Sequence, residues 1–539
     1  MPSREPSITD SNLKHSDSYS EVSRPQRTYA SDVAKEGKLG DAALAIIGEG
    51  TEQREITEEE DKRVLRKVDW WLMPVVLLVY FLQQLDKSSL SYASVFGIVE
   101  ETGLVGTQYS WLTSIVYLAQ LVWQPISSYL LVRLPISKYL FVNVFMWGAV
   151  VACTAAAHEF KGLMATRFFL GLFEASVAPA FITITQMWWR RREQTVRLAM
   201  WMAMNGVTAM VGSLLSWGLG HIKGSLHPYQ TIFMFIGLLT VLCSPIVVLV
   251  LPDSPIKARF LTADEKIVAL ERLRANNQGT ESKIWKWDHV LEVLLDVKTY
   301  LWFLLLFLCC VPSGGISAFG PLIIQGFGFD QFHTILFNIP FGFIQVVVTL
   351  LSALISTKVK LKWPVIFALT IPPIAGAAAL LKLGRGSEQR GALLACYYVL
   401  SFFTGIQPML YSWSAQNTAG HTKKLCTTGI VFVAQCAGNI VGPLLYRTED
   451  KPYYHRGLVA NLVCWAALAV MTGVTAVYLK YLNQKHEATR LRVGKVGKVI
   501  DRSLESYKAV DKGKEGEAKN EQAFDDLTDL KNEDFIYVL

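Results

Sequence analysis

Two opposite charges lie side by side within a long apolar run, at Asp86 and Lys87 of "FLQQLDKSSLSYA". A charge at the centre of a bilayer costs on the order of 3 kcal/mol on insertion scales, so charges kept at such positions usually have a use. Gln83, Lys87 and Ser91 recur at intervals of four and share one helix face. This pattern predicts a water-filled cavity in which Lys87 binds an anion, while Asp86 packs against a neighbouring helix or shares a proton. The alternative is a charge pair at the membrane boundary, reached by snorkelling.

A second set of charges lies in "TRFFLGLFEASVAP", where Arg167, Gly171 and Glu174 fall on one helix face with Gly171 leaving room between the charges. Burial disfavours the ionised form of a carboxyl, so Glu174 is suited to exchange a proton. The planar guanidinium of Arg167 is suited to bind a carboxylate. The alternative is a structural pair in which Arg167 anchors a helix end and contacts Glu174. Pro179 is expected to kink this helix.

Other polar side chains recur inside the later apolar runs, and any single one of them could instead join two helices. Their recurrence in both halves of the chain favours a polar cavity. The residues predicted to bind substrate are Lys87, Arg167, Gln83, Ser91, Asn205, Trp201, Gln407, Tyr411 and Asn439, and those predicted to carry the proton are Glu174 and Asp86.

Such residues need membrane-spanning helices to position them. The 539-residue chain is 51% hydrophobic and 18% charged, against about 25% charged in soluble proteins. Apolar runs of about 20 residues, the length that crosses a bilayer, predict an all-α membrane protein with twelve spanning helices in two halves of six. The predicted spans are 70–93, 108–131, 138–157, 162–187, 196–219, 229–251, 299–325, 333–356, 363–382, 391–414, 425–446 and 457–481.

Five segments are expected along the chain. They are a disordered cytosolic tail at 1–66, a six-helix half at 67–251, a cytosolic loop with a short amphipathic helix at 252–298, a second six-helix half at 299–482 and a charged cytosolic tail at 483–539. Basic residues gather in alternate loops, which predicts cytosolic termini. Thr57 with Glu60, and Thr262 with Glu265, have the spacing of capping boxes that begin helices.

Composition also excludes some functions. The net charge of +7 comes from Lys and Arg in short loops between apolar runs, where topology explains it better than nucleic-acid binding does. We find no nucleophile–base set, no metal-ligand spacing and no phosphate-binding glycine loop in the sequence, so we expect neither an enzyme nor a cofactor.

The sequence resembles the major facilitator superfamily, and within it the fungal anion:cation symporters of the allantoate permease type. The resemblance rests on "LDKSSLSYASVFGI", "RFFLGLFEA", "WWRRREQTVRLAMW", "DSPIKARFLTADEK", "GGISAFGPLIIQGFGF", "GNIVGPLLY" and "DDLTDLKNEDFIYVL". It implies a plasma-membrane carrier, acting as a monomer, that takes up a small organic anion such as allantoate, ureidosuccinate or a vitamin acid with protons by alternating access. One departure is the loop "PISSYLLVRLPISKY", which lacks the acidic residue usual in the superfamily.

Two other functions fit the same residues. An exporter of an anionic metabolite would use the same charges in the opposite direction. A non-transporting nutrient sensor would signal through its cytosolic tails.

Overall fold

The computed structural model describes residues 57–222, 224–255, 257–274, 286–492, 528–533 and 535–539. Residues 1–56 of the predicted N-terminal tail and 493–527 of the predicted C-terminal tail lie outside the described residues. All regular secondary structure in the described part of the chain is helical. The predicted all-α fold is therefore confirmed.

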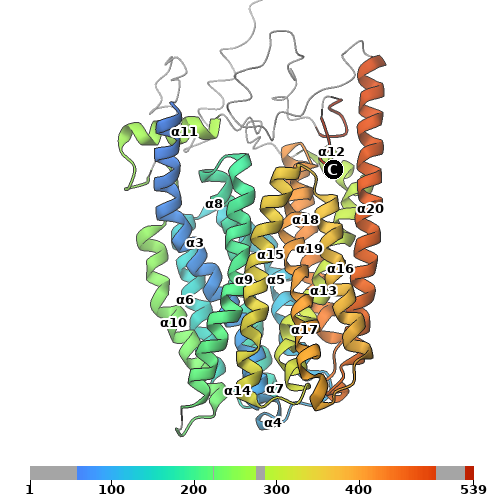
Figure 1. The fold of residues 1–539 in the computed structure, drawn as a ribbon. Helices are drawn as coiled ribbons and strands as arrows, with labels where there is room; N and C mark the ends of the chain where they lie inside the picture. Colours follow the sequence, from blue (N-terminus) through green and yellow to red (C-terminus); the bar gives the residue numbers. More distant parts are fainter. Residues whose placement is uncertain (1–56, 223, 256, 275–285, 493–527, 534) are drawn as a thin grey trace, which may run out of the picture. The chain divides into compact units, whose positions relative to one another are not determined.

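Each predicted span corresponds to a helix or to two consecutive helices (Figure 1). The first half contains α3 (Glu58–Val95), α4 (Ile98–Glu101), α5 (Gln108–Arg133), α6 (Ile136–Thr154), α7 (Phe160–Glu174), α8 (Val177–Trp188), α9 (Arg191–Gly220) and α10 (Pro228–Val250). The linking segment contains α11 (Ala263–Arg274) and α12 (Trp287–Leu295). The second half contains α13 (Val297–Gln325), α14 (Gln331–Leu336), α15 (Asn338–Val359), α16 (Trp363–Lys382), α17 (Arg390–Leu400), α18 (Ile406–Gln416), α19 (His421–Leu444) and α20 (His455–Arg492).

Eleven spans in the described residues are long and apolar enough to cross a membrane, one fewer than predicted. The remaining predicted span, 108–131, is helical as well, since α5 forms over this range as a 26-residue helix.

Prolines explain two breaks within the spans. Helix α7 ends at Glu174 and α8 begins at Val177, two residues before Pro179. Because Pro179 has no N–H to donate to the carbonyl of the preceding turn, the helix is interrupted there. The tenth span contains a 3₁₀ turn at Ser401–Gly405, again just before a proline, Pro408.

Both predicted capping boxes are present. Glu60 N–H donates to the Thr57 hydroxyl at 3.3 Å, and Glu265 N–H donates to the Thr262 hydroxyl at 3.4 Å. The first helix therefore begins at Glu58, twelve residues before the predicted span. Glu265 also accepts a hydrogen bond from Lys67 at 2.6 Å, which ties α11 to the start of α3. Burial alone would raise the pKa of Glu265, but Lys67 and Thr262 lower it below the ordinary value.

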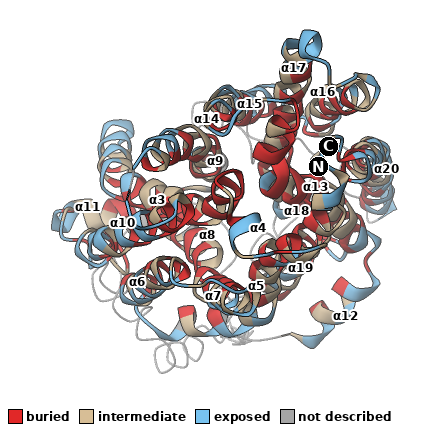
Figure 2. Cartoon of the chain, turned by 90° about the horizontal axis from the view of Figure 1, so that it is seen from below, coloured by how far each residue is buried: buried red, intermediate tan, exposed pale blue. Residues whose placement is uncertain are grey.

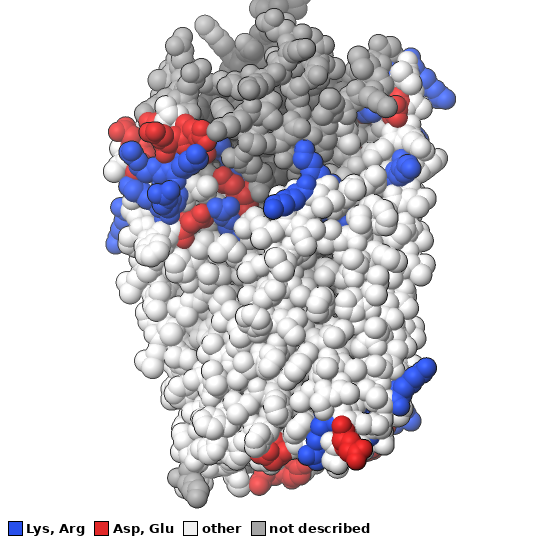
Figure 3. Space-filling model, in the orientation of Figure 1, with Lys and Arg blue, Asp and Glu red and all other residues white. Residues whose placement is uncertain are grey.

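Charged side chains gather at the two ends of the helices, and the band between them is almost free of charge on the face in Figure 3. Large apolar side chains are exposed there, including Leu242 and Leu249, 75% and 77% exposed. The buried faces of the helices point inward (Figure 2). This distribution suits a bilayer, where apolar side chains face lipid.

The segment predicted as a charged cytosolic tail, 483–539, is partly helical and partly packed against the second half in the described residues. Helix α20 continues to Arg492, and the final residues return to pack against the second half. Tyr537 is only 1% exposed and Asp529 is fully buried. This region is charged in composition, and its burial depends on partners distant in sequence.

Candidate functional site

A cavity of about 400 Å³ lies between the two halves. Helices α3, α5 and α9 contribute to its wall from the first half, and α13, α15, α18 and α19 from the second. The structure brings together in this wall most of the residues predicted from the sequence. They are Gln83, Lys87, Ser91, Glu174, Trp201, Asn205, Gln407, Tyr411 and Asn439.

Lys87 and Glu174 form an ion pair in the cavity wall, with 3.2 Å between the ammonium nitrogen and the carboxylate. The side chain of Glu174 is fully buried and that of Lys87 is 16% exposed. Gln120 donates to the same carboxylate at 3.1 Å, and Gln83 donates to the Glu174 backbone carbonyl at 3.4 Å. Helix α7 thus ends at Glu174, whose carboxylate faces the ammonium group of Lys87 in the cavity wall.

Gly171 has a role different from the predicted one. A Cβ at Gly171 would lie 2.2 Å from the backbone oxygen of Val116 on α5. The glycine therefore allows close contact between α5 and α7, and does not serve as a spacer between two charges. The close contact brings Gln120 of α5 within reach of Glu174.

Asp86 does not line the cavity, although its neighbour Lys87 does. It is fully buried and accepts hydrogen bonds from the indole N–H of Trp147 at 2.6 Å and the hydroxyl of Thr240 at 3.2 Å. The carboxylate therefore joins α3 to α6 and α10. Of the two expectations for Asp86, these contacts correspond to packing against neighbouring helices.

Arg167 also lies outside the large cavity. It is 3% exposed, borders a small side pocket together with Lys87, and its guanidinium lies over the ring of Phe233 at 5.2 Å. Its Nε and Nη2 have no hydrogen-bond partner among the described residues. The contact between Arg167 and Glu174 that the alternative interpretation proposed is absent from the ion pairs of the described residues, in which Glu174 pairs with Lys87.

Amide and hydroxyl groups from both halves complete the cavity wall. In the second half, Tyr411 donates its hydroxyl to the Gln435 side chain, and Asn439 donates to the Gln435 backbone carbonyl at 2.9 Å. In the first half, Asn205 donates to the Tyr80 hydroxyl at 3.4 Å, and Trp201 packs edge-on against the Tyr80 ring. A polar solute would meet donors and acceptors on both sides.

The sequence reasoning missed the contribution of α5. Tyr117, Gln120 and Gln124 line the cavity, and Gln120 contacts Glu174 directly. The signal was available, because these polar residues interrupt an apolar run in the same way as Gln83 does.

The cavity extends toward one end of the helices, whereas the two halves are joined at the other. Its lining reaches Gln194 and Lys424, near the starts of α9 and α19, at the end where α11 lies (Figure 1). At the opposite end, near α4, the hydroxyls of Tyr109 and Ser110 on α5 donate to backbone carbonyls of Ala318 and Tyr446, at 2.9 and 3.1 Å. These bonds join the two halves there.

Comparisons with known proteins agree with this architecture. Residues 76–443 match the family profile of the Major Facilitator Superfamily. An uncharacterized transporter of Schizosaccharomyces pombe is 35% identical over 482 residues, covering 89% of this chain and 88% of that protein. The allantoate permease of Saccharomyces cerevisiae is 30% identical over 509 residues, covering 92% and 89%.

Among solved structures, a bacterial homolog of the human lysosomal transporter Spinster, in an inward-facing and occupied conformation, superposes with a TM-score of 0.57. It is 13% identical in sequence, and the alignment covers 76% of this chain and 96% of that chain. This likeness concerns the fold.

Proposed function

The chain belongs to the Major Facilitator Superfamily and is a multi-pass membrane transporter, and we propose that it imports a small carboxylated metabolite together with protons by alternating access. The observation that carries the proposal is the Lys87–Glu174 ion pair in the wall of the cavity between the halves. The ammonium group of Lys87 can pair there with either of two carboxylates, that of Glu174 or that of the substrate.

This choice would couple the two solutes. While Glu174 is ionised, it holds Lys87 and competes with an incoming anion. When Glu174 takes up a proton, the attraction between the two side chains falls and Lys87 becomes available to the substrate carboxylate. Loading of proton and anion would then favour each other, which is the linkage that a symporter needs.

The other cavity residues favour a substrate that carries amide or hydroxyl groups besides its carboxylate. Gln83, Asn205, Gln407 and Asn439 offer both donors and acceptors. The name of the yeast relative, allantoate permease, is consistent with such a compound. Ser91, Trp201 and Tyr411 would complete the contact surface.

The two predicted residues outside the cavity take other parts in this proposal. Asp86, held by Trp147, would fix the part of α3 that presents Lys87, and Glu174 would be the group that carries the proton. Arg167 lies on the side pocket that it shares with Lys87, where it would add positive potential that attracts an anion.

The proposed location is the plasma membrane, with both described ends of the chain on the cytosolic side. The basic loops support this orientation through the positive-inside rule. The cavity, whose lining extends toward the α11 end, would then face the cytosol, so that this conformation would release substrate.

The experiment that tests the proposal is uptake by proteoliposomes of purified protein, with an acidic outside and a panel of radiolabelled nitrogen-containing and vitamin carboxylic acids. We expect at least one acid to accumulate against its gradient and the accumulation to collapse with a protonophore. Lys87→Ala should abolish it, while Lys138→Ala, an exposed lysine outside the cavity, should not. Accumulation that is unchanged in Lys87→Ala would refute the proposal.

The same vesicles separate the alternatives. An exporter would drive net flux in the opposite direction under the opposite proton gradient. A sensor would bind a compound without moving it.

A further inference from the structure

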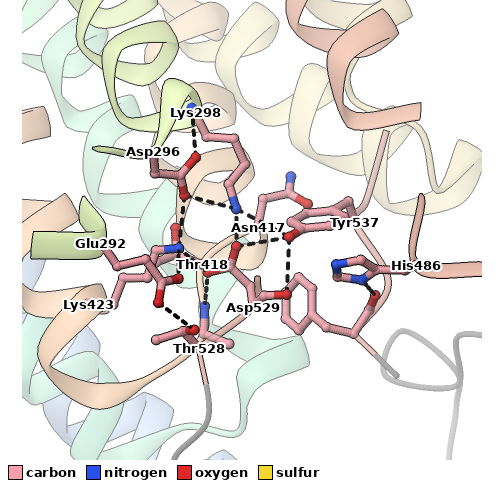
Figure 4. Close-up of polar contacts among 12 residues, drawn as sticks. Glu292, Asp296, Lys298, Asn417, Thr418, Lys423, His486, Thr528, Asp529 and Tyr537 are labelled. Carbon is pink, nitrogen blue, oxygen red and sulfur yellow. Dashed lines mark hydrogen bonds and ion pairs between the residues drawn. The ribbon is translucent and has the colours of Figure 1, made fainter. Parts of the chain in front are cut away.

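Residues 528–533 and 535–539 fill a socket at the α11 end of the second half. Thr528 and Asp529 are fully buried, and Tyr537 is 1% exposed. The socket is made by α12, the starts of α13 and α19, the end of α18 and α20, as Figure 4 shows. The segment is thus held by elements that are distant from it in sequence.

A buried cluster of charges holds the first part of the segment. Asp529 pairs with Lys298, at the start of α13, and with Lys423, at the start of α19, 2.9 Å away. Lys423 also pairs with Glu292 of α12 at 2.9 Å, and Asp296 contacts both lysines. Burial alone would raise the pKa of Asp529, but the two lysines lower it below the ordinary value. Asp529 is therefore ionised at neutral pH.

The second part of the segment is held through its backbone. Asn483 of α20 donates to the Tyr537 carbonyl at 2.9 Å and accepts from the Tyr537 N–H at 2.8 Å. Asn417 makes the same pair of bonds with Val538, at 3.0 and 2.8 Å. The backbone oxygen of Leu539 accepts from the N–H of Lys362 at 2.7 Å, next to the start of α16.

The side chain of each of these two asparagines binds both the backbone N–H and the backbone carbonyl of one residue, as a neighbouring β-strand would. Such contacts fix a peptide by its backbone, while the buried ring of Tyr537, whose hydroxyl donates to the Asp529 carboxylate at 3.0 Å, adds specificity.

We propose that this socket is an intramolecular binding site for the chain's own C-terminal peptide, and that the docked peptide clamps the α11-side ends of α13, α16, α18, α19 and α20 into one rigid unit. Three of these helices, α13, α18 and α19, line the cavity. In alternating access each half moves largely as a rigid body. The peptide would supply that rigidity at the α11-side ends of these helices.

The test compares three full-length variants in detergent. In Asp529→Ala and Asn417→Ala the peptide should release, while Lys531→Ala, a change of an exposed residue in the same segment, should leave it docked. Carboxypeptidase Y should trim the C-terminus of the first two at least about tenfold faster than the wild type, since tenfold corresponds to about 1.4 kcal/mol of opening free energy. Wild-type protein trimmed as fast as Asp529→Ala would overturn the proposal.

Hydrogen–deuterium exchange then separates a clamp from a general loss of stability. In Asp529→Ala we expect faster exchange over 297–302 and 422–428, at the starts of α13 and α19, and no change in α6 of the first half. Faster exchange throughout the chain, or none at the two helix starts, would contradict the clamp.

Rescue in trans gives a further arm. A chain ending at residue 527 should recover slow exchange at the two helix starts when a synthetic peptide of residues 528–539 is added, and not with the peptide that carries Asp529→Ala. If the shortened chain does not fold, the full-length variants decide the question alone. None of these measurements needs a transport substrate, so they succeed or fail independently of the proposed function.

Discussion

Replacing Glu174 with Gln is the sharpest perturbation of the proposed coupling. The change removes one charge while keeping the size of the side chain. Gln at this position can still accept the hydrogen bond that Gln120 donates at 3.1 Å. The main loss is the attraction to Lys87, whose ammonium group lies 3.2 Å away.

The size of this loss follows from the geometry. Two unit charges 3.2 Å apart attract with about 5 kcal/mol at an effective dielectric constant of about 20. Desolvation of the buried carboxylate offsets much of that gain. Lys87 keeps contact with the cavity, since its side chain is 16% exposed. We therefore expect Glu174→Gln to lower the free energy of unfolding by on the order of 1–3 kcal/mol.

The effect on binding should have the opposite sign. In the wild type at neutral pH, an anion must displace the Glu174 carboxylate from Lys87. In Glu174→Gln this competitor is absent, so the anion should bind at least about tenfold more tightly, for a gain of about 1.4 kcal/mol. The affinity should also lose its dependence on pH, because the titrating group is gone.

The assay is again the proteoliposome, with the acid that the panel identifies. Glu174→Gln should exchange labelled for unlabelled substrate across the membrane but should not accumulate it in response to a proton gradient. Glu100→Gln, the same change at an exposed position outside the cavity, should behave as the wild type. Accumulation by Glu174→Gln against a gradient would remove Glu174 from the coupling role.

Three further changes test the packing around the site. Gly206→Ala places a Cβ 2.3 Å from a backbone oxygen of α15, so it should lower the melting temperature in detergent through about 1–3 kcal/mol of overpacking; Gly218→Ala, where no atom lies within 4 Å, should not. Trp147→Phe removes the indole donor of buried Asp86 and should cost about 1.5–3 kcal/mol of unfolding free energy, measured by thermal unfolding; an unchanged melting temperature would count against that hydrogen bond. The folded-state pKa of Asp529 lies below its ordinary value of 3.8. The ionised carboxylate therefore stabilises the fold above that value, and this stabilisation is lost as the pH falls through the folded-state pKa. The difference in melting temperature between wild type and Asp529→Asn should be constant above about pH 5 and shrink below about pH 4.

A test of the sensor alternative by deletion must leave the C-terminal socket intact. Deletion of 483–539 would remove Asn483 of α20 and the buried segment that contains Asp529. Such a deletion would disturb the fold of the second half together with any signal. A deletion confined to 493–527 spares these residues, and uptake that persists while signalling is lost would then favour a sensor role in addition to transport.

The helices and their order follow from local sequence patterns, because apolar runs, caps and prolines act locally. A run of about 20 apolar residues has no favourable place except a bilayer or a core, and the Thr57 and Thr262 capping boxes form between residues three apart. Local patterns also predict which residues have a functional role. Lys87 and Glu174 are predicted to be functional because any charge at membrane depth is costly.

Which of these residues contact one another depends on how the helices pack. Asp86 and Lys87 are adjacent in sequence, yet one is sealed between α3, α6 and α10 and the other faces the cavity. Glu174 shares a predicted helix face with Arg167 but pairs with Lys87 of another helix. The C-terminal segment has a polar composition, and its burial depends on Lys298 and Lys423, which lie more than a hundred residues away. A helix pattern fixes the direction of a side chain, whereas its partner depends on the rotation and contact of a neighbouring helix, which no local pattern encodes.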